Sequence, residues 1–313
     1  MVAPGSPQTG AGDAVRPDNR GMRLAILGLG LIGGSVARAL HARTPGAWTV
    51  SAWSATGRGP AAALAAGVVD VAAASPAEAI ADADIVLLAA PALACLRLID
   101  ELAGPLRASL RNGAVVTDVA STKRAIVERA LAAELPFVGG HPMAGRETSG
   151  FAAADAALFV DRPWVICAAD GSDGAVARVE RVVRNVGALP VRMDAADHDA
   201  AVAAISHLPL VVAAALAEAA LGRSEPAHAR ELAASGWRDM TRLANGDAAM
   251  GAGIVATNAD LVGVAVRGMR AALDEWLAEL ERAGGPDAAR LEARFAAARR
   301  LLAAERGEGS DGR

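Results

Sequence analysis

The chain has 313 residues and a net charge of −4, and its isoelectric point is near 5.8. This length is enough for two domains, and the mildly acidic balance excludes the basic surface that binds nucleic acid, so we expect a small-molecule partner. Hydrophobic residues make up 53%, but many are alanine, which buries little area and favours close helix packing. The two cysteines, Cys95 and Cys167, lie in apolar runs, which favours buried thiols and a cytoplasmic location.

The two ends of the chain differ in composition from the rest. Residues 1–21 are rich in proline, glycine and polar side chains and lack the apolar core of a signal peptide, so we expect a disordered leader. Residues 306–313 are polar, and we expect a flexible tail. The longest apolar runs contain or adjoin charges and fall short of an uncharged span of about 18 residues, so we expect no membrane segment.

From residue 23 onward, strand-like apolar runs alternate with helical patterns. The runs are RLAILG, WTVSAW, DADIVLLAAP, AVVTDVAS, FVGGHPM and WVICAA, and PVRM closes the series at 190–193. Strands separated by helices predict βαβ units and a doubly wound, Rossmann-type parallel sheet over residues 22–193. Alanine-rich helical patterns then continue, which predicts an all-helical domain over residues 194–305.

The segment GLGLIGGS places Gly28, Gly30 and Gly33 in GxGxxG spacing, after the first strand and at the start of a helix. Glycines there permit a tight turn and a close backbone approach, so that a pyrophosphate can bind at the helix N-terminus. This context predicts a dinucleotide cofactor, and a purely structural turn is the alternative. The cofactor site is assigned to these glycines and to Leu31, Ile32 and Pro91.

After the second strand the chain reads AWSATGRG. An NAD-selective site usually carries an acidic residue here, which binds the ribose hydroxyls. This segment instead offers Ser54, Thr56 and Arg58, two hydroxyls and a cation that could hold a 2′-phosphate. We therefore expect NADP to be accepted and leave NAD use open; the alternative is a solvated loop whose arginine touches nothing.

Two polar segments, DVASTK and GGHPMAG, follow predicted strands. Ligands of a doubly wound sheet bind outside the carboxyl ends of the strands, so we expect Ser121 and His141 to face the nicotinamide. An imidazole that titrates near neutrality can accept a hydroxyl proton while hydride leaves the same carbon, and a serine hydroxyl can orient that alcohol. We assign His141 and Ser121 as catalytic; a loop-stabilising histidine is the alternative.

Five segments occur in a characteristic order and spacing: GLGLIGGS, DVASTK, GGHPMAGRETSGF, HDAAVAAISHLP and GWRDMTRLA. Together they resemble the prephenate and arogenate dehydrogenases of tyrosine biosynthesis, over roughly residues 22–290. The resemblance implies oxidative decarboxylation of a cyclohexadienol, in which loss of CO2 drives aromatisation. It also implies that His141 binds or deprotonates the ring hydroxyl and that Ser121 positions the same oxygen and the nicotinamide.

The resemblance implies three further residues for the substrate site. Arg242 corresponds to an arginine that grips a substrate carboxylate, to which a bidentate guanidinium is suited. Glu147 matches an acidic residue at the active-site mouth, and His207 matches a histidine near the substrate. From the residues alone, His207 is equally consistent with a satisfied core group, and Pro209 predicts a kink beside it. We expect His198 to serve the helix start or packing.

One position departs from the pattern of the family. Many prephenate-using members resemble SHLPH, whose second histidine is associated with the substrate or tyrosine site, and here that position is Leu210. Feedback inhibition by tyrosine and strict prephenate preference are therefore open. The substrate can be prephenate, arogenate or a 4-amino analogue.

The helical half is more apolar than one small domain needs, and family members pair these helices across a two-fold axis, which implies a homodimer. A compact monomer is the alternative, and no metal ligand is assigned. Two other functions are weighed. Another hydroxyacid or imine oxidoreductase would need a lysine or aspartate where the chain reads ISHLP. A non-catalytic dinucleotide-binding regulator would have no reason to keep Ser121, His141 and Arg242 together.

Overall fold

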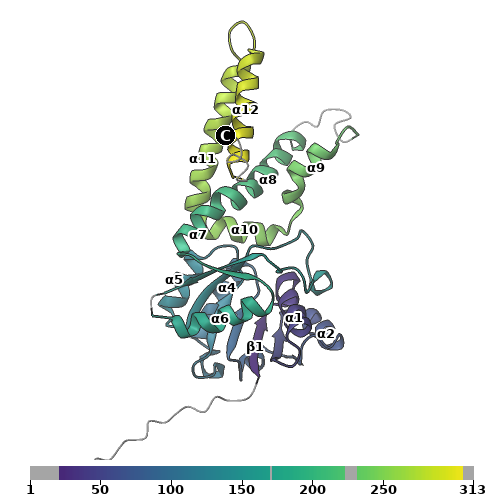
Figure 1. Ribbon diagram of the computed structural model, residues 1–313, viewed down its shortest axis with the longest axis vertical. Helices are drawn as coiled ribbons and strands as arrows, with labels where there is room; N and C mark the ends of the chain where they lie inside the picture. The colour runs from purple at the N-terminus through teal and green to yellow at the C-terminus, as the bar shows by residue number, and fades with distance from the viewer. Residues whose placement is uncertain (1–20, 170, 223–230, 306–313) are drawn as a thin grey trace, which may run out of the picture. The chain divides into compact units, whose positions relative to one another are not determined.

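The computed structural model describes residues 21–169, 171–222 and 231–305 (Figure 1). The predicted tail, and the predicted leader apart from residue 21, lie outside these residues. Contacts divide the chain into two compact units. Unit 1 consists of Met1–Ala90, Arg97–Val119 and Ala130–Arg192, and unit 2 of Pro91–Leu96, Ala120–Arg129 and Met193–Arg313. Two short segments of the first half of the chain, one of them carrying Ser121, therefore belong to unit 2.

Unit 1 is built on one eight-stranded sheet with the strand order β3-β2-β1-β4-β5-β6-β7-β8. The strands are β1 (Met22–Leu27), β2 (Trp48–Trp53), β3 (Val71–Ala72), β4 (Ile85–Leu88), β5 (Val115–Asp118), β6 (Phe137–Pro142), β7 (Pro163–Ala168) and β8 (Leu189–Arg192). All residues of β4 and β5 are buried, as expected for central strands of a sheet covered on both faces. The predicted Rossmann-type sheet is confirmed.

The sheet differs from the predicted one in a single pairing. Strands β3 to β6 pair in parallel, but β6 and β7 are antiparallel, and β8 runs parallel to β7. A parallel pair needs a crossover connection, usually a helix. Between β6 and β7 the structure has loops and the short 3₁₀ helix η2 (Phe151–Ala153), so β7 returns beside β6 in the opposite direction.

Helices follow most strands of unit 1. They are α1 (Leu31–Arg43), α2 (Arg58–Ala65), α3 (Pro76–Ile80), the 3₁₀ helix η1 (Arg107–Ser109) and α6 (Asp173–Asn185). Two more, α4 (Ala92–Ala103) and α5 (Arg124–Ala132), begin in unit 2 and end in unit 1.

Unit 2 is helical, which confirms the predicted second domain. After residue 193 its elements are α7 (Ala195–Val202), η3 (Ala203–His207), α8 (Leu208–Leu221), α9 (Ser235–Thr241), η4 (Arg242–Asn245), α10 (Ala248–Thr257), α11 (Ala259–Leu280) and α12 (Ala288–Glu305). Helices α11 and α12 lie side by side as a hairpin (Figure 1), and the rings of Trp276 and Phe295 have centroids 5.0 Å apart.

The predicted disturbance at Pro209 takes the form of a π-helical turn. This turn, η3, ends at His207, and Pro209 lies in the first turn of α8. Proline has no N–H to offer the carbonyl of Ile205, and a wider turn accommodates a missing bond within a helix. The run Ala195–Leu221 remains a helix of 27 residues.

The same run is long and apolar enough to cross a membrane, with a mean hydropathy of 2.1 in its most apolar window, 22% of which is buried. Helices α10 and α11 pass this test as a pair bent by 96°. Length and composition alone do not separate such helices from those of a protein interior or of a subunit interface.

Candidate active site

The phosphate-binding loop joins β1 to α1, and its glycines are required by geometry. Gly28 has φ +103°, and a Cβ on it would lie 2.3 Å from the carbonyl oxygen of Ala89. A Cβ on Gly33 would lie 2.3 Å from the carbonyl oxygen of Gly28. A Cβ on Gly30, in contrast, would meet no atom within 4 Å, and no side chain caps α1 there. The amide end of α1 is therefore an open cradle that fits a pyrophosphate.

The segment after β2 lies beside this loop. The N–H of Gly28 donates to the carbonyl of Trp53 at 2.7 Å, and a Cβ on Gly59 would lie 2.4 Å from the carbonyl oxygen of Leu29. Between these two contacts the chain carries Ser54, half-buried, and Thr56 and Arg58, both exposed. Residues 54–58 include no acidic side chain. The predicted 2′-phosphate ligands are thus adjacent to the phosphate loop.

His141 is half-buried near the end of β6, opposite Val165 of β7. The residue before it, Gly140, donates its N–H to the buried carboxylate of Asp118 at 3.0 Å. A Cβ on Gly140 would lie 2.5 Å from the carbonyl oxygen of Asp118, so only glycine fits this approach of β5 and β6. Asp118 was not singled out from the sequence; its signal is an acid that ends an apolar strand.

The loop that follows β6 carries Glu147, which is exposed, and it is anchored on α1. Ser35 Oγ accepts the N–H of Asp155 at 2.9 Å, and Asp155 pairs with Arg146 at 2.6 Å. The guanidinium of Arg38 lies 4.5 Å from the centre of the Phe151 ring. The loop bearing Glu147 is therefore packed on the helix that begins at the phosphate loop.

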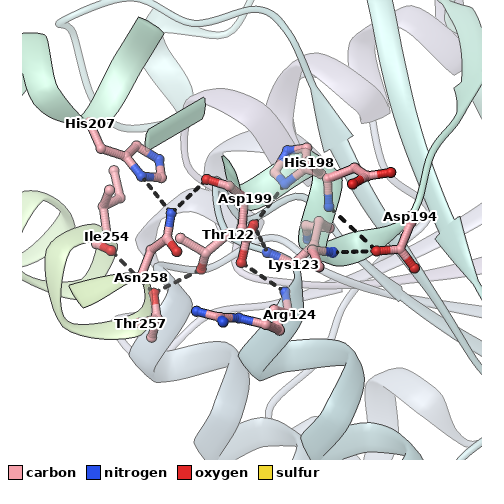
Figure 2. A network of polar contacts seen from close by, with 12 residues as sticks. Thr122, Lys123, Arg124, Asp194, His198, Asp199, His207, Ile254, Thr257 and Asn258 are labelled. Carbon is pink, nitrogen blue, oxygen red and sulfur yellow. Dashed lines mark hydrogen bonds and ion pairs between the residues drawn. The ribbon is translucent and has the colours of Figure 1, made fainter. Parts of the chain in front are cut away.

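In unit 2, Asn258 contacts the ring of His207 at one of its two nitrogens, Nδ1. Asn258 Nδ2 donates to the carbonyl of Asp199 at 2.9 Å and lies 3.3 Å from His207 Nδ1 (Figure 2). A carbonyl only accepts, so the atom facing it must be the amide NH2 group. His207 Nδ1 then accepts as well, and the ring proton is on Nε2. Burial is the main cause that lowers the pKa of His207, although Asp199 and the Ser121 backbone oppose it. The ring is neutral near pH 7.

The other ring nitrogen of His207 is an unsatisfied donor. The residue is 1% exposed, and Nε2 forms no hydrogen bond within good geometry, although the backbone of Ser121 is near enough to act on the ring. A buried donor without an acceptor costs about 1–3 kcal/mol. An acceptor on a ligand would remove this cost. The structure thus brings the ring of His207 to the backbone of Ser121, within unit 2.

Arg242 lies at a different place in unit 2. It is exposed at the start of η4 and lines a hollow of about 560 Å³ with Trp237, Arg238 and the end of α8 near Ala217. Ala217 is ten residues beyond His207, about 15 Å of helix rise. Ser121 and His207 do not line this hollow, so the structure does not bring Arg242 beside them. Pro91, also in unit 2, is exposed just before α4.

A buried polar network was missed from the sequence (Figure 2), and it holds Thr122, Lys123 and Arg124, the residues that follow Ser121. Asp199 is fully buried, and its carboxylate accepts the N–H groups of Lys123 and Arg124. His198, expected as a packing residue, is buried with Nδ1 2.8 Å from Asp199 Oδ1. The only sequence signal is the pair HD shortly before ISHLP. Over the described ranges no three His, Cys, Asp or Glu side chains form a group that could hold a metal ion.

Comparisons with known proteins agree with this arrangement. The family model of the prephenate dehydrogenase nucleotide-binding domain matches residues 36–191, and that of the prephenate dehydrogenase dimerization domain matches residues 194–291. The prephenate dehydrogenase of Bacillus subtilis (strain 168) is 33% identical over 265 residues, which are 83% of this chain and 68% of that protein.

Solved structures are similar over nearly the whole chain. Synechocystis arogenate dehydrogenase has a TM-score of 0.70 at 30% identity and covers 92% of this chain and 98% of its own. Prephenate dehydrogenase from A. aeolicus, in complex with hydroxyphenyl propionate and NAD+, has a TM-score of 0.78 at 26% identity with the same coverage. Since both domains are matched in order, the chain belongs to the prephenate dehydrogenase family.

Proposed function

We propose that this enzyme oxidatively decarboxylates prephenate, arogenate or both, with reduction of NADP and with NAD use left open. The solved relatives are a prephenate and an arogenate dehydrogenase, and the former binds NAD+. The structural observation that carries the proposal is the buried corner of unit 2, where the unsatisfied N–H of His207 lies next to Ser121. A buried N–H donor at this point suits an oxygen acceptor on a substrate.

The cofactor would bind on unit 1. The open amide end of α1, with Gly30 at its first position, would hold the pyrophosphate, and Gly28 and Gly33 keep the loop tight. Leu31 and Ile32 begin the helix at this point, and Pro91 follows the segment after β4. When bound, the nicotinamide accepts hydride from the substrate. Every other part of the reaction falls to side chains of this chain.

The preference for NADP rests on the segment 54–58. It lies beside the phosphate loop and carries two hydroxyls and the guanidinium of Arg58, with no carboxylate to repel a 2′-phosphate. A guanidinium–phosphate contact is a charge-assisted hydrogen bond, the stronger kind. Arg58 is exposed, so solvent screening limits its contribution.

We assign proton transfer to His141 and orientation of the substrate hydroxyl to Ser121. As hydride leaves the carbinol carbon, the hydroxyl proton passes to the imidazole of His141, and the bond to the ring carboxylate breaks to release CO2. The electron pair of that bond completes the aromatic ring, and the imidazole then returns its proton to the phenolate oxygen, which gives the phenol. A histidine suits this step because its pKa near neutrality lets it accept and release the proton.

The substrate groups would be read by His207, Arg242 and Glu147. The Nε2–H of His207 is suited to a substrate oxygen, and Arg242 to a carboxylate. Glu147 is placed on the exposed loop after β6, in keeping with a residue at the site mouth. The side chains of prephenate and arogenate, a keto acid and an amino acid, would be distinguished here. Leu210 provides no polar group for this purpose.

We further propose a cytoplasmic homodimer formed through unit 2. Large apolar side chains are exposed along α11 and α12: Val266, Leu273, Leu277, Leu280, Phe295 and Leu302. On α11 four of these recur at helical spacing and form one stripe. A second copy of this chain would cover it. The apolar run Ala195–Leu221 is tied into unit 2 by its buried His198, Asp199 and His207, so we assign its apolar surface to protein packing and not to a membrane.

A paired assay tests the proposed function. The purified enzyme is given prephenate or arogenate with NADP or NAD, and formation of reduced cofactor is followed. We expect turnover with at least one ring substrate, and none with simple 2- or 3-hydroxy acids. If neither ring substrate is oxidised with either cofactor, the proposal is wrong, and turnover of a hydroxy acid would favour the alternative oxidoreductase class.

A further inference from the structure

Helix α5 begins with two basic residues, whose side chains cannot cap it. The residue before it is Lys123 and its first residue is Arg124, and its first turn contains no acidic residue. Two cations at a helix N-terminus oppose the helix dipole, and neither side chain can accept a hydrogen bond. The backbone at this helix start also sets the position of Ser121, which lies only two residues before Lys123 and to which we assign a catalytic role.

Asp199 supplies the missing cap from another helix. Its Oδ1 accepts the N–H of Lys123 at 2.7 Å and its Oδ2 accepts the N–H of Arg124 at 2.9 Å, from positions 76 and 75 residues away in the chain. His198 Nδ1 approaches the same Oδ1 at 2.8 Å. Burial opposes ionisation, but these three hydrogen bonds hold the pKa of Asp199 below its usual value. Asp199 is therefore a buried carboxylate at the positive end of α5.

The backbone of Asp199 extends the network to His207. Its carbonyl receives one proton of the Asn258 amide, and the second proton of that amide faces His207 Nδ1. This amide fixes the tautomer that leaves the proton on Nε2. One residue of α7 thus binds the backbone of Lys123 and Arg124 through its carboxylate and is linked to His207 through its carbonyl and Asn258 (Figure 2).

A further bond ties down the residue next to Ser121. Thr122 Oγ1 and Thr257 Oγ1 are 2.8 Å apart, and Thr257 also donates to the carbonyl of Gly253 at 2.7 Å. The hydroxyl of Thr122 is thereby held by α10. The two residues that follow Ser121 are therefore both held by hydrogen bonds, Thr122 through its hydroxyl and Lys123 through its backbone N–H.

We propose that Asp199 is a positioning residue, which sets the place of Ser121 and the protonation state of His207 in one step. This rests on the proposed function of Ser121 and His207. His198 orients the carboxylate of Asp199, and Asn258 transmits its position to the imidazole. Asp199 itself touches neither substrate nor cofactor and acts through Ser121 and His207.

The Asp199→Asn variant tests the proposal because it keeps the shape and removes the charge and one acceptor. We expect kcat to fall at least tenfold while the Kd for NADP, measured by calorimetry, stays within twofold. The matched control is Asp260→Asn. Asp260 also bonds Arg124, at 2.5 Å, but through the exposed guanidinium, so kcat should stay within twofold.

A double-mutant comparison separates positioning from general support of the fold. In a Ser121→Ala background, Asp199→Asn should lower kcat much less than in the wild type, because the group it positions is gone. An equal loss of kcat in both backgrounds would overturn the proposal, as would an unchanged kcat in the single variant.

Hydrogen exchange gives a readout that does not depend on activity. The amides of Lys123 and Arg124 should be protected in the wild type and exchange at least tenfold faster in Asp199→Asn, with the sheet of unit 1 unchanged. Unchanged exchange at these amides would refute the proposed cap whatever the substrate is. Faster exchange in an enzyme that oxidises neither ring substrate would refute the proposed function and leave the cap standing.

Discussion

The two units bury their apolar side chains to very different extents. In unit 1, every residue of β4 and β5 is buried. In unit 2, the buried residues of the 22-residue helix α11 are Val262 and Glu279, and Phe295 and Leu301 of α12 are 66% and 75% exposed. Burial of apolar surface is the main driving force of folding, and the helices α11 and α12 bury much less of their apolar surface than the central strands of unit 1 do.

This difference matches a division of chemistry. Unit 1 carries the phosphate loop and His141, to which we assign cofactor binding and proton transfer. Unit 2 carries Ser121, His207 and Arg242, and it carries the exposed apolar side chains through which we propose a dimer forms. Substitutions at the site residues of unit 1 should therefore act on chemistry or on the cofactor. In unit 2, substitutions of Ser121 and Asp199 should act on chemistry, and those of Arg242 and of the exposed apolar side chains on substrate binding and assembly.

The largest effect is expected at His141. In His141→Ala, kcat should fall by about two orders of magnitude or more, since general-base assistance is typically worth 10² to 10⁴. Binding of NADP, measured by calorimetry, should be nearly unchanged, because the phosphate loop is intact. The control His41→Ala removes an exposed histidine of α1 and should keep kcat within twofold. A His141→Ala enzyme within threefold of wild type would refute the assignment.

The next largest effect concerns assembly. The double variant Leu273→Arg/Leu277→Arg changes two leucines of α11 that are 53% and 50% exposed in the single chain. It should weaken the proposed dimer at least 100-fold, since each leucine buried in an interface contributes about 1.5–3 kcal/mol. Sedimentation velocity measures this change. Leu131→Arg places the same charge on a leucine of unit 1 that is 47% exposed and should leave the dimer intact. A double variant that remains dimeric shows that another surface forms the interface.

A smaller effect is expected at Arg242. Arg242→Ala should raise the KM for the ring substrate about tenfold or more with kcat within threefold, because a carboxylate held equally in ground and transition states is uniform binding. Steady-state kinetics measures both constants. The control is Arg238→Ala, which removes another cation from the same hollow and should leave the KM for the ring substrate within twofold of wild type. A lowered kcat at unchanged KM would point to a structural role.

The smallest effect is expected at Arg58. In Arg58→Ala, the KM for NADP should rise about tenfold, as for loss of one charge-assisted hydrogen bond, and the KM for NAD should stay within twofold. The two cofactors thus serve as each other's control in one enzyme. A wild-type enzyme with kcat/KM at least tenfold higher for NAD, together with an Arg58→Ala enzyme unchanged for both, would contradict the interpretation of residues 54–58.

Local patterns were enough for most of the fold. The strand Trp48–Trp53 was predicted at the observed residues. The edge strand β3 has two residues and is too short for any periodicity. The reversed direction of β7 depends on the return of a long loop, which no run of apolar residues encodes. Such features come from pairing between distant segments.

The candidate site divides in the same way. Sequence motifs identify the glycines of the phosphate loop, His141 at the end of a strand and Ser121 before a helix. The cap by Asp199 is not, because it joins residues 75 and 76 positions apart. The unsatisfied N–H of His207 is likewise a property of three-dimensional packing. Sequence reasoning therefore finds residues that carry chemistry more readily than residues that hold them in place.

The central claim is that hydride transfer and loss of CO2 occur in one reaction. The most direct test measures the CO2 released and the reduced cofactor formed from prephenate and from arogenate in the same vessel. We predict a ratio of one CO2 to one reduced cofactor for whichever ring substrate is oxidised. Reduced cofactor formed without CO2 would contradict the account, because the enzyme would then be an ordinary alcohol or hydroxyacid dehydrogenase.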